Sequence, residues 1–117
     1  MSSTIAELVS SQKKFDAKHG PEGRSWAQQI DQQHINVLLE LTVALTGEIG
    51  EFANITKKIA RGDFTLESGK PELASELADI FVYLLKLAGQ LGIDLEAEYS
   101  IKMKLNEKRF KRFLKRQ

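Results

Sequence analysis

The stretch LLELTVALTGEIGEFANI, residues 38–55, most constrains what this chain can fold into. Its apolar residues recur at intervals of three and four, which is the period of one face of an α-helix. Glu48 falls in the middle of that apolar stripe, and Glu51 falls at its edge on the neighbouring turn. Gly47 and Gly50, each of which weakens a helix by about 1 kcal/mol relative to alanine, stand beside them. We expect these glycines to leave room for a neighbouring helix or a ligand.

The rest of the chain also favours helices. Thr4 and Glu7 match a capping box, Pro71 suits a first helical turn, and Asp94 suits an N-cap. The expected helices cover residues 4–18, 35–61, 71–91 and 95–113. The sequence therefore predicts an all-α fold, a four-helix bundle whose core is completed by oligomerisation. We expect a single domain over residues 1–117, with a motif-bearing core at about 35–113.

Composition excludes several classes of protein. The 117 residues contain no cysteine, which rules out disulfides and thiolate metal sites, and the formal net charge is +1. The longest apolar run is too short to span a bilayer, and the N-terminus lacks the apolar region of a signal peptide. We therefore expect a cytoplasmic protein with no membrane partner. We do not expect nucleic-acid binding either, and interpret the basic C-terminal segment as a helix end.

A second acidic pair lies on the third expected helix. Glu76 and Asp79 flank its predicted apolar stripe, which consists of Leu73, Leu77, Ile80, Leu84, Leu87 and Leu91. Either pair alone is usually a solvated helix edge. If the two stripes pack together, however, Glu48, Glu51, Glu76 and Asp79 meet in a partly buried space. Four carboxylates placed there must take up protons or hold cations.

Oxygen ligands favour a hard divalent cation, and Mg²⁺ in proteins commonly binds phosphate as well. We expect Mg²⁺, with Mn²⁺ as a substitute. Di-iron bundles use Glu-x-x-His pairs, whereas His19 and His34 lie outside both acidic pairs, so iron is disfavoured. Asp31 and His34 are interpreted as loop or helix-start residues.

The stretches GEIGEFANITKK and PELASELADIFVYLLKLAGQLGIDL resemble the MazG-like all-α nucleoside triphosphate pyrophosphohydrolases. The family pattern is ExxE on one helix and ExxD on the next, which is met here by the two acidic pairs. The family also carries Lys, Asn and Arg on the following helix, matched by Lys102, Asn106 and Arg109. The resemblance covers about residues 38–110.

The resemblance implies Mg²⁺ held by Glu48, Glu51, Glu76 and Asp79 in a hydrolase of nucleoside triphosphates. The expected products are a nucleoside monophosphate and pyrophosphate. It also implies a homodimer or homotetramer with a site shared between subunits, in which Lys102, Asn106 and Arg109 contact phosphate or sugar. On their spacing alone, these three residues are equally well explained as a solvated basic face.

We assign the general base to Glu48, because its apolar setting would raise its pKa. Lys58 is a further candidate for substrate binding. Trp26, in a loop, is a candidate for stacking on a base, although a structural role in the loop is the stronger interpretation. Two other functions stay open: a phosphoribosyl-ATP pyrophosphohydrolase, which has a related helical core, and a non-catalytic helical interaction protein.

Overall fold

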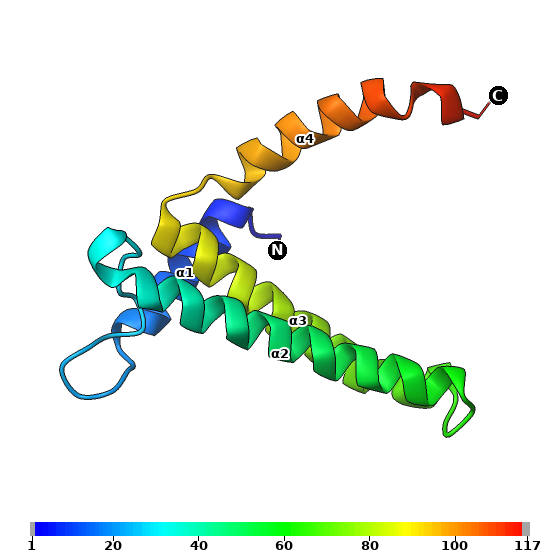
Figure 1. Cartoon of the computed structure of the whole chain (residues 1–117), viewed down its shortest axis with the longest axis horizontal. Coiled ribbons are helices and arrows are strands. Elements are labelled where there is room, and N and C mark those ends of the chain that lie inside the picture. Colours follow the sequence, from blue (N-terminus) through cyan, green and yellow to red (C-terminus); the bar gives the residue numbers. More distant parts are fainter. Residues whose placement is uncertain (1, 116–117) are drawn as a thin grey trace.

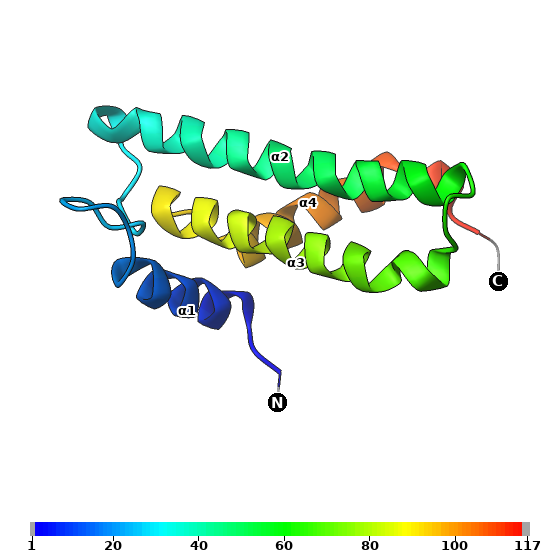
Figure 2. The same ribbon diagram turned by 90° about the horizontal axis from the view of Figure 1, so that it is seen from below.

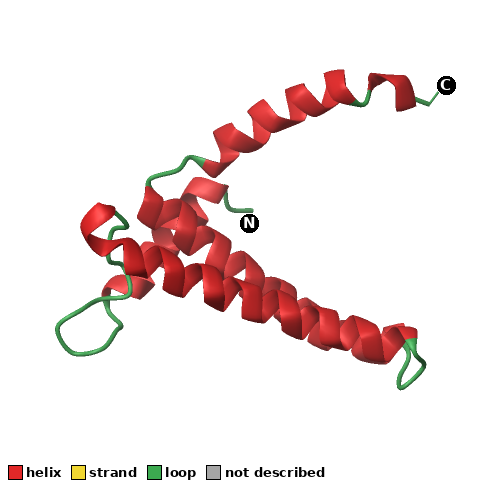
Figure 3. Cartoon of the chain, viewed as in Figure 1, coloured by secondary structure: helices red, strands yellow, loops and turns green. Residues whose placement is uncertain are grey.

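The computed structural model describes residues 2–115, and its regular elements are all helical (Figure 3). The four α-helices are α1 (Ile5–Ala17), α2 (Ile35–Ala60), α3 (Leu66–Leu91) and α4 (Leu95–Arg109). Two short 3₁₀ helices, η1 (Gln32–His34) and η2 (Lys111–Phe113), precede α2 and follow α4. The expected all-α fold with four helices is confirmed.

Helices α2 and α3 form a long antiparallel hairpin that is the framework of the molecule (Figure 1). The predicted apolar stripe of α2 is confirmed, because all of its residues are buried or partly buried, namely Val37, Leu41, Ala44, Leu45, Phe52, Ile55 and Ile59. At the closed end of the hairpin, Phe64 and Ile59 lie so close to Gly69 that a Cβ there would come within 2.7 Å and 2.9 Å of their side chains. Gly69 therefore lets the two helices approach, and Phe64 is a packing residue.

The start of α3 was predicted wrongly. The helix begins at Leu66, five residues before the expected Pro71, because the Thr65 hydroxyl accepts a hydrogen bond from the Ser68 backbone N–H at 3.1 Å and acts as the N-cap. Pro71 therefore lies inside the helix. It lacks a backbone N–H and leaves one carbonyl of the first turn without its helical partner. The predicted C-terminus is confirmed at Leu91, where Gly92 takes the left-handed conformation at φ 71°.

Helix α3 is covered on two sides, and the prediction of a single apolar stripe was wrong in part. Figure 2 shows α2 and α1 on opposite sides of α3, and both helices pack against it. Leu85, Ala88 and Gly89 are accordingly buried, although none of them belongs to the predicted stripe. At Gly89 a Cβ would lie 3.0 Å from a methyl group of Val9, so α1 docks closely there. The stripe residues that remain exposed are Leu77, Leu84 and Leu91.

Helix α4 diverges from the α2–α3 hairpin and does not close a four-helix bundle within the chain (Figure 1). It is tied to α1 by a hydrogen bond from the Ile5 N–H to the Glu96 carboxylate at 2.9 Å. It also ends at Arg109, four residues before the predicted Phe113, where the chain tightens into η2. The Cα radius of gyration is 17.8 Å, whereas a compact domain of this length has about 13.4 Å. The fold is therefore open on one side.

The glycines in α2 do not accommodate a neighbour within residues 2–115. A Cβ built on Gly47 or Gly50 would meet nothing within 4 Å. Both residues are exposed. The space beside Gly47 and Gly50, which we expected a helix or a ligand to fill, therefore faces outward from the hairpin.

Candidate metal-binding and nucleotide-binding site

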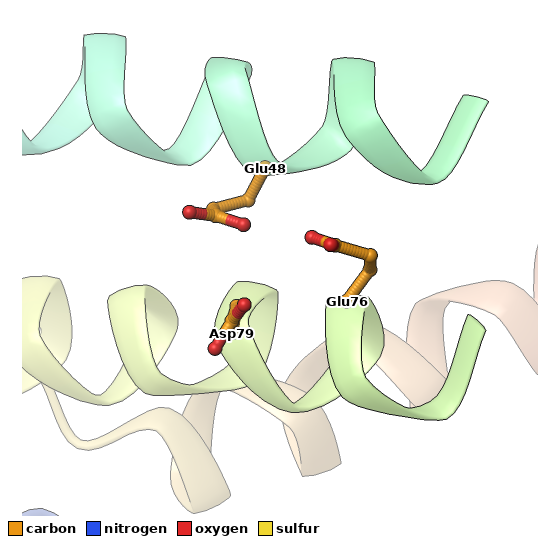
Figure 4. A group of neighbouring side chains, drawn as sticks. All are labelled: Glu48, Glu76 and Asp79. Atoms are coloured by element: carbon orange, nitrogen blue, oxygen red, sulfur yellow. The ribbon is translucent and has the colours of Figure 1, made fainter. Parts of the chain in front are cut away.

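Three of the four predicted acids come together between α2 and α3. Glu48 points from α2 towards Glu76 and Asp79 on α3 (Figure 4), and each of the three offers an oxygen atom within 4.8 Å of the other two. The helical period explains the geometry, because Glu76 and Asp79 lie one turn apart on the same face. Glu48 and Glu76 are partly buried, and Asp79 is exposed. The three carboxyl groups form what we call the carboxylate cluster.

The cluster contains two buried oxygen atoms that no donor within residues 2–115 satisfies, namely Glu48 Oε2 and Glu76 Oε2. Buried acceptors without partners are costly, and neighbouring carboxylates repel one another. A divalent cation relieves both costs, since hard cations take carboxylate oxygens as ligands. The donor set therefore fits a hard divalent metal ion.

Glu51 lies outside the cluster but close to it. It is exposed on α2, and both its charge and its capacity to accept a hydrogen bond act on Glu76. A protonated Glu76 can donate to Glu48. This bond, partial burial and the proximity of Glu51 together raise the pKa of Glu76 to about 7. The structure therefore raises the pKa of Glu76, and the assignment of the general base to Glu48 stays a prediction.

The raised pKa predicts a falling stability of the metal-free protein as pH rises from about 4.5 to about 7. In this window the folded state keeps the proton on Glu76 and the unfolded state loses it, so deprotonation favours unfolding. We expect the difference in melting temperature between wild type and Glu76→Gln to change across this window, measured by thermal denaturation in EDTA. Parallel pH profiles for the two proteins would contradict the assignment.

A cleft of about 510 Å³ extends from the carboxylate cluster to the end of the hairpin where α1 docks. Glu48 and Asp79 line it at one end, and Trp26, Lys86 and Gln90 line it as well. Asp79 and Gln90 are eleven residues apart on α3, which corresponds to about 16 Å along the helix axis. One elongated cleft thus connects acids, an aromatic ring and polar side chains.

The loop before α2 positions Trp26 in this cleft. The backbone N–H of Trp26 donates a hydrogen bond to the backbone carbonyl of His19 at 2.8 Å. The His19 ring stacks between the rings of Phe15 and Trp26, with centroid distances of 4.1 Å to Phe15 and 5.6 Å to Trp26. Gly20 is required at the base of the loop, because its φ of 141° is unfavourable for other residues and a Cβ would collide with the Arg24 carbonyl. Trp26 remains 44% exposed. Part of the indole is therefore open to a ligand.

The sequence patterns did not single out Lys86 and Gln90, which line the cleft, or Asp16, which is buried beside Lys86. Asp16 is only 2% exposed and binds Lys86 through an ion pair of 3.0 Å. The Lys86 ammonium group in turn lies 5.2 Å from the centre of the Trp26 ring. Gln90 is 3% exposed. One sequence signal could have identified Lys86 and Gln90. They interrupt the apolar run FVYLLKLAGQL four residues apart, which places them on one face of the helix.

The other predicted substrate-binding residues are not brought to the acids within one chain. Lys58 lies on α2 ten residues beyond Glu48, about 15 Å along the helix axis. Lys102, Asn106 and Arg109 lie on the diverging helix α4 (Figure 1). Arg109 is placed over the ring of Phe110, with 5.0 Å between the guanidinium carbon and the ring centre. These four assignments stay predictions.

The fold and the site define an all-α protein with a carboxylate cluster able to hold a metal ion, at one end of a cleft. Among known proteins, this chain is similar to dCTP pyrophosphatase 1 of Homo sapiens, with 30% identity over 95 residues. The match covers 78% of this chain and 56% of that protein. The rat protein of the same name is 28% identical over 89 residues, covering 73% of this chain and 52% of that protein.

Gene 37 protein of Mycobacterium phage L5 is 41% identical over 66 residues, which is 54% of this chain and 57% of that protein. The chain thus spans about half the length of the curated relatives it matches. No family model and no solved structure matches it. No helix within residues 2–115 is long and apolar enough to cross a membrane.

Proposed function

We propose that this protein is a Mg²⁺-dependent nucleotide pyrophosphohydrolase of the MazG-like type. It would convert (deoxy)nucleoside triphosphates to nucleoside monophosphates and pyrophosphate. The observation that carries the proposal is that one cleft is lined by Glu48 and Asp79 of the carboxylate cluster at one end and by Trp26 at the other. The resemblance of the two acidic motifs to this family and the names of the distant relatives support it.

In this proposal Glu48, Glu76 and Asp79 hold the metal ion, and Glu51 completes the set from the exposed edge of α2. A bound Mg²⁺ would neutralise phosphate charge and polarise a water molecule for attack. One of the carboxylates would accept the proton of the attacking water. Glu48 remains our choice for this role because it is partly buried and lines the cleft.

The base of the nucleotide would lie at the Trp26 end of the cleft. An exposed indole offers a stacking surface that every base can use. With the triphosphate at the carboxylate cluster, an extended nucleotide follows the length of the cleft. This arrangement supports the assignment of Trp26 as a substrate-binding residue.

We further propose that a second copy of the chain completes the site as a homodimer or homotetramer. Apolar side chains remain exposed on α2, α3 and α4, among them Leu39, Val43, Phe81, Ile101 and Leu105. Their burial between copies would provide the core that the open fold lacks. Lys102, Asn106 and Arg109 would then contact phosphate or sugar from α4 of a neighbouring copy, and Lys58 would assist. Sedimentation equilibrium that shows only monomer at working concentrations would refute this part.

The function is tested by a product assay over a panel of nucleoside and deoxynucleoside triphosphates, beginning with dCTP and run with Mg²⁺ and with EDTA. Metal-dependent release of monophosphate and pyrophosphate is expected. Diphosphate and phosphate as products would refute the assigned bond cleavage. No turnover of any triphosphate would favour phosphoribosyl-ATP as the substrate, which is assayed next. Inactivity on that compound too would favour the non-catalytic interaction protein.

A further inference from the structure

Gln90 contains a buried hydrogen-bond acceptor that no donor within residues 2–115 satisfies. The side chain is 3% exposed and lines the cleft that also contains Trp26. Its Oε1 atom is buried and accepts no hydrogen bond from the described residues. An unpaired acceptor of this kind is costly to keep, and a ligand group that donates to it would relieve the cost.

The orientation of the Gln90 amide is fixed by its surroundings. Its Nε2 atom donates to the Gln28 backbone carbonyl at 2.7 Å. A carbonyl oxygen can only accept, so a flipped amide would place two acceptors against each other. The Ile30 N–H also donates to the Gln90 backbone carbonyl at 2.9 Å, which holds the loop over this end of α3. The position of Oε1 is therefore set before any ligand binds.

Lys86 supplies a donor at the same end of the cleft. It stands four residues before Gln90 on α3, so the two side chains are neighbours on one helix face. One N–H of its ammonium group is used by Asp16 at 3.0 Å, and an ammonium group has two more. Lys86 lines the same cleft as Gln90. This end of the cleft therefore presents a fixed acceptor and, one helical turn away, a donor.

We propose that Gln90 selects the base of the nucleotide by accepting a hydrogen bond from an exocyclic amine. This inference rests on the proposed function for the orientation of the nucleotide, with its phosphates at the carboxylate cluster and its base at Trp26. Cytosine and adenine carry an amine at the ring position far from the sugar, next to a ring nitrogen that accepts. Gln90 and Lys86 complement that order of donor and acceptor.

Uracil, thymine and guanine present the opposite order, a carbonyl oxygen followed by a ring N–H. Against Gln90 and Lys86 they would bring two acceptors together and two donors together. Unpaired or opposed polar groups in a buried site each cost on the order of a tenfold to hundredfold loss in affinity. The preferred substrates are therefore triphosphates of cytosine or adenine.

The test uses the full chain and measures binding without turnover. Trp26 is the single tryptophan of the sequence, so its fluorescence reports on the cleft alone. Titration with dCMP and dUMP, which differ at the amine, is expected to give affinities at least about tenfold apart in favour of dCMP. The Gln90→Leu variant should lose this preference. Gln29→Leu, the same change at an exposed residue of the neighbouring loop, should keep it.

Equal affinities of the wild type for dCMP and dUMP, binding of neither, or an unchanged preference in Gln90→Leu would overturn the inference. If circular dichroism shows that Gln90→Leu is unfolded, the wild type is titrated instead with the pyrimidin-2-one analogue, which lacks the amine. An analogue that binds as tightly as dCMP would then overturn it. The product assay decides the proposed function separately, because a base preference in binding without pyrophosphate release refutes catalysis and leaves the role of Gln90 intact.

Discussion

Replacing Glu48 by Gln is expected to lower turnover of the best triphosphate by about 10²- to 10⁴-fold, the range typical for loss of a positioned proton acceptor. The substitution keeps the shape of the side chain and removes one charge from a cluster whose three oxygens lie within 4.8 Å of one another. Repulsion with Glu76 and Asp79 falls as a result. We therefore expect the melting temperature of the metal-free variant to equal or exceed that of the wild type.

Asp79→Asn should behave in the same way, because Asp79 belongs to the same cluster and lines the same cleft. The matched control is Glu72→Gln, which removes an exposed charge from α3 one turn before Glu76. It should keep both activity and stability. Full turnover by Glu48→Gln and Asp79→Asn would show that the carboxylate cluster is not the active site. Loss of activity with loss of fold would instead identify a structural role.

The hairpin that builds this cluster could be predicted from the sequence because its signals are local. The period of three and four on α2 placed Glu48 among apolar residues, and the same period paired Glu76 with Asp79. The caps at Thr4 and Asp94 are confirmed, because their side chains accept hydrogen bonds from the backbone N–H groups of Glu7 and Ala97. A helix boundary was missed where two local signals competed, since the cap at Thr65 prevailed over the proline at 71.

What the sequence could not predict depends on contacts between remote residues. Asp16 and Lys86 are separated by 70 positions, and their ion pair forms only because α1 docks on the second face of α3. Gln90 likewise acquires its role from the loop at Gln28, 62 positions away. An unpaired buried oxygen cannot be recognised before the burial itself is known. The acidic end of the cleft was therefore predictable, and the polar residues of its other end were not.

Addition of Mg²⁺ to the metal-free protein is expected to raise its melting temperature, and the effect should be large. Glu48 Oε2 and Glu76 Oε2 are buried acceptors that no donor in the described part of the chain satisfies, and the unfolded chain does not hold them together. A cation that binds only the folded state at 100 times its Kd stabilises it by about 2.7 kcal/mol, which for a domain of this size is on the order of 10 °C. Thermal denaturation with Mg²⁺ and with EDTA measures the shift, and NaCl at matched ionic strength controls for screening.

The control variants separate the cluster from the rest of α3. Glu72→Gln should show the full shift and Glu48→Gln a reduced one, because Glu48, unlike Glu72, would supply a ligand to the cation. Equal melting temperatures with Mg²⁺ and EDTA would mean that the cluster binds no cation at these concentrations, and its mutual repulsion would then be relieved by the proton on Glu76, whose pKa is raised to about 7.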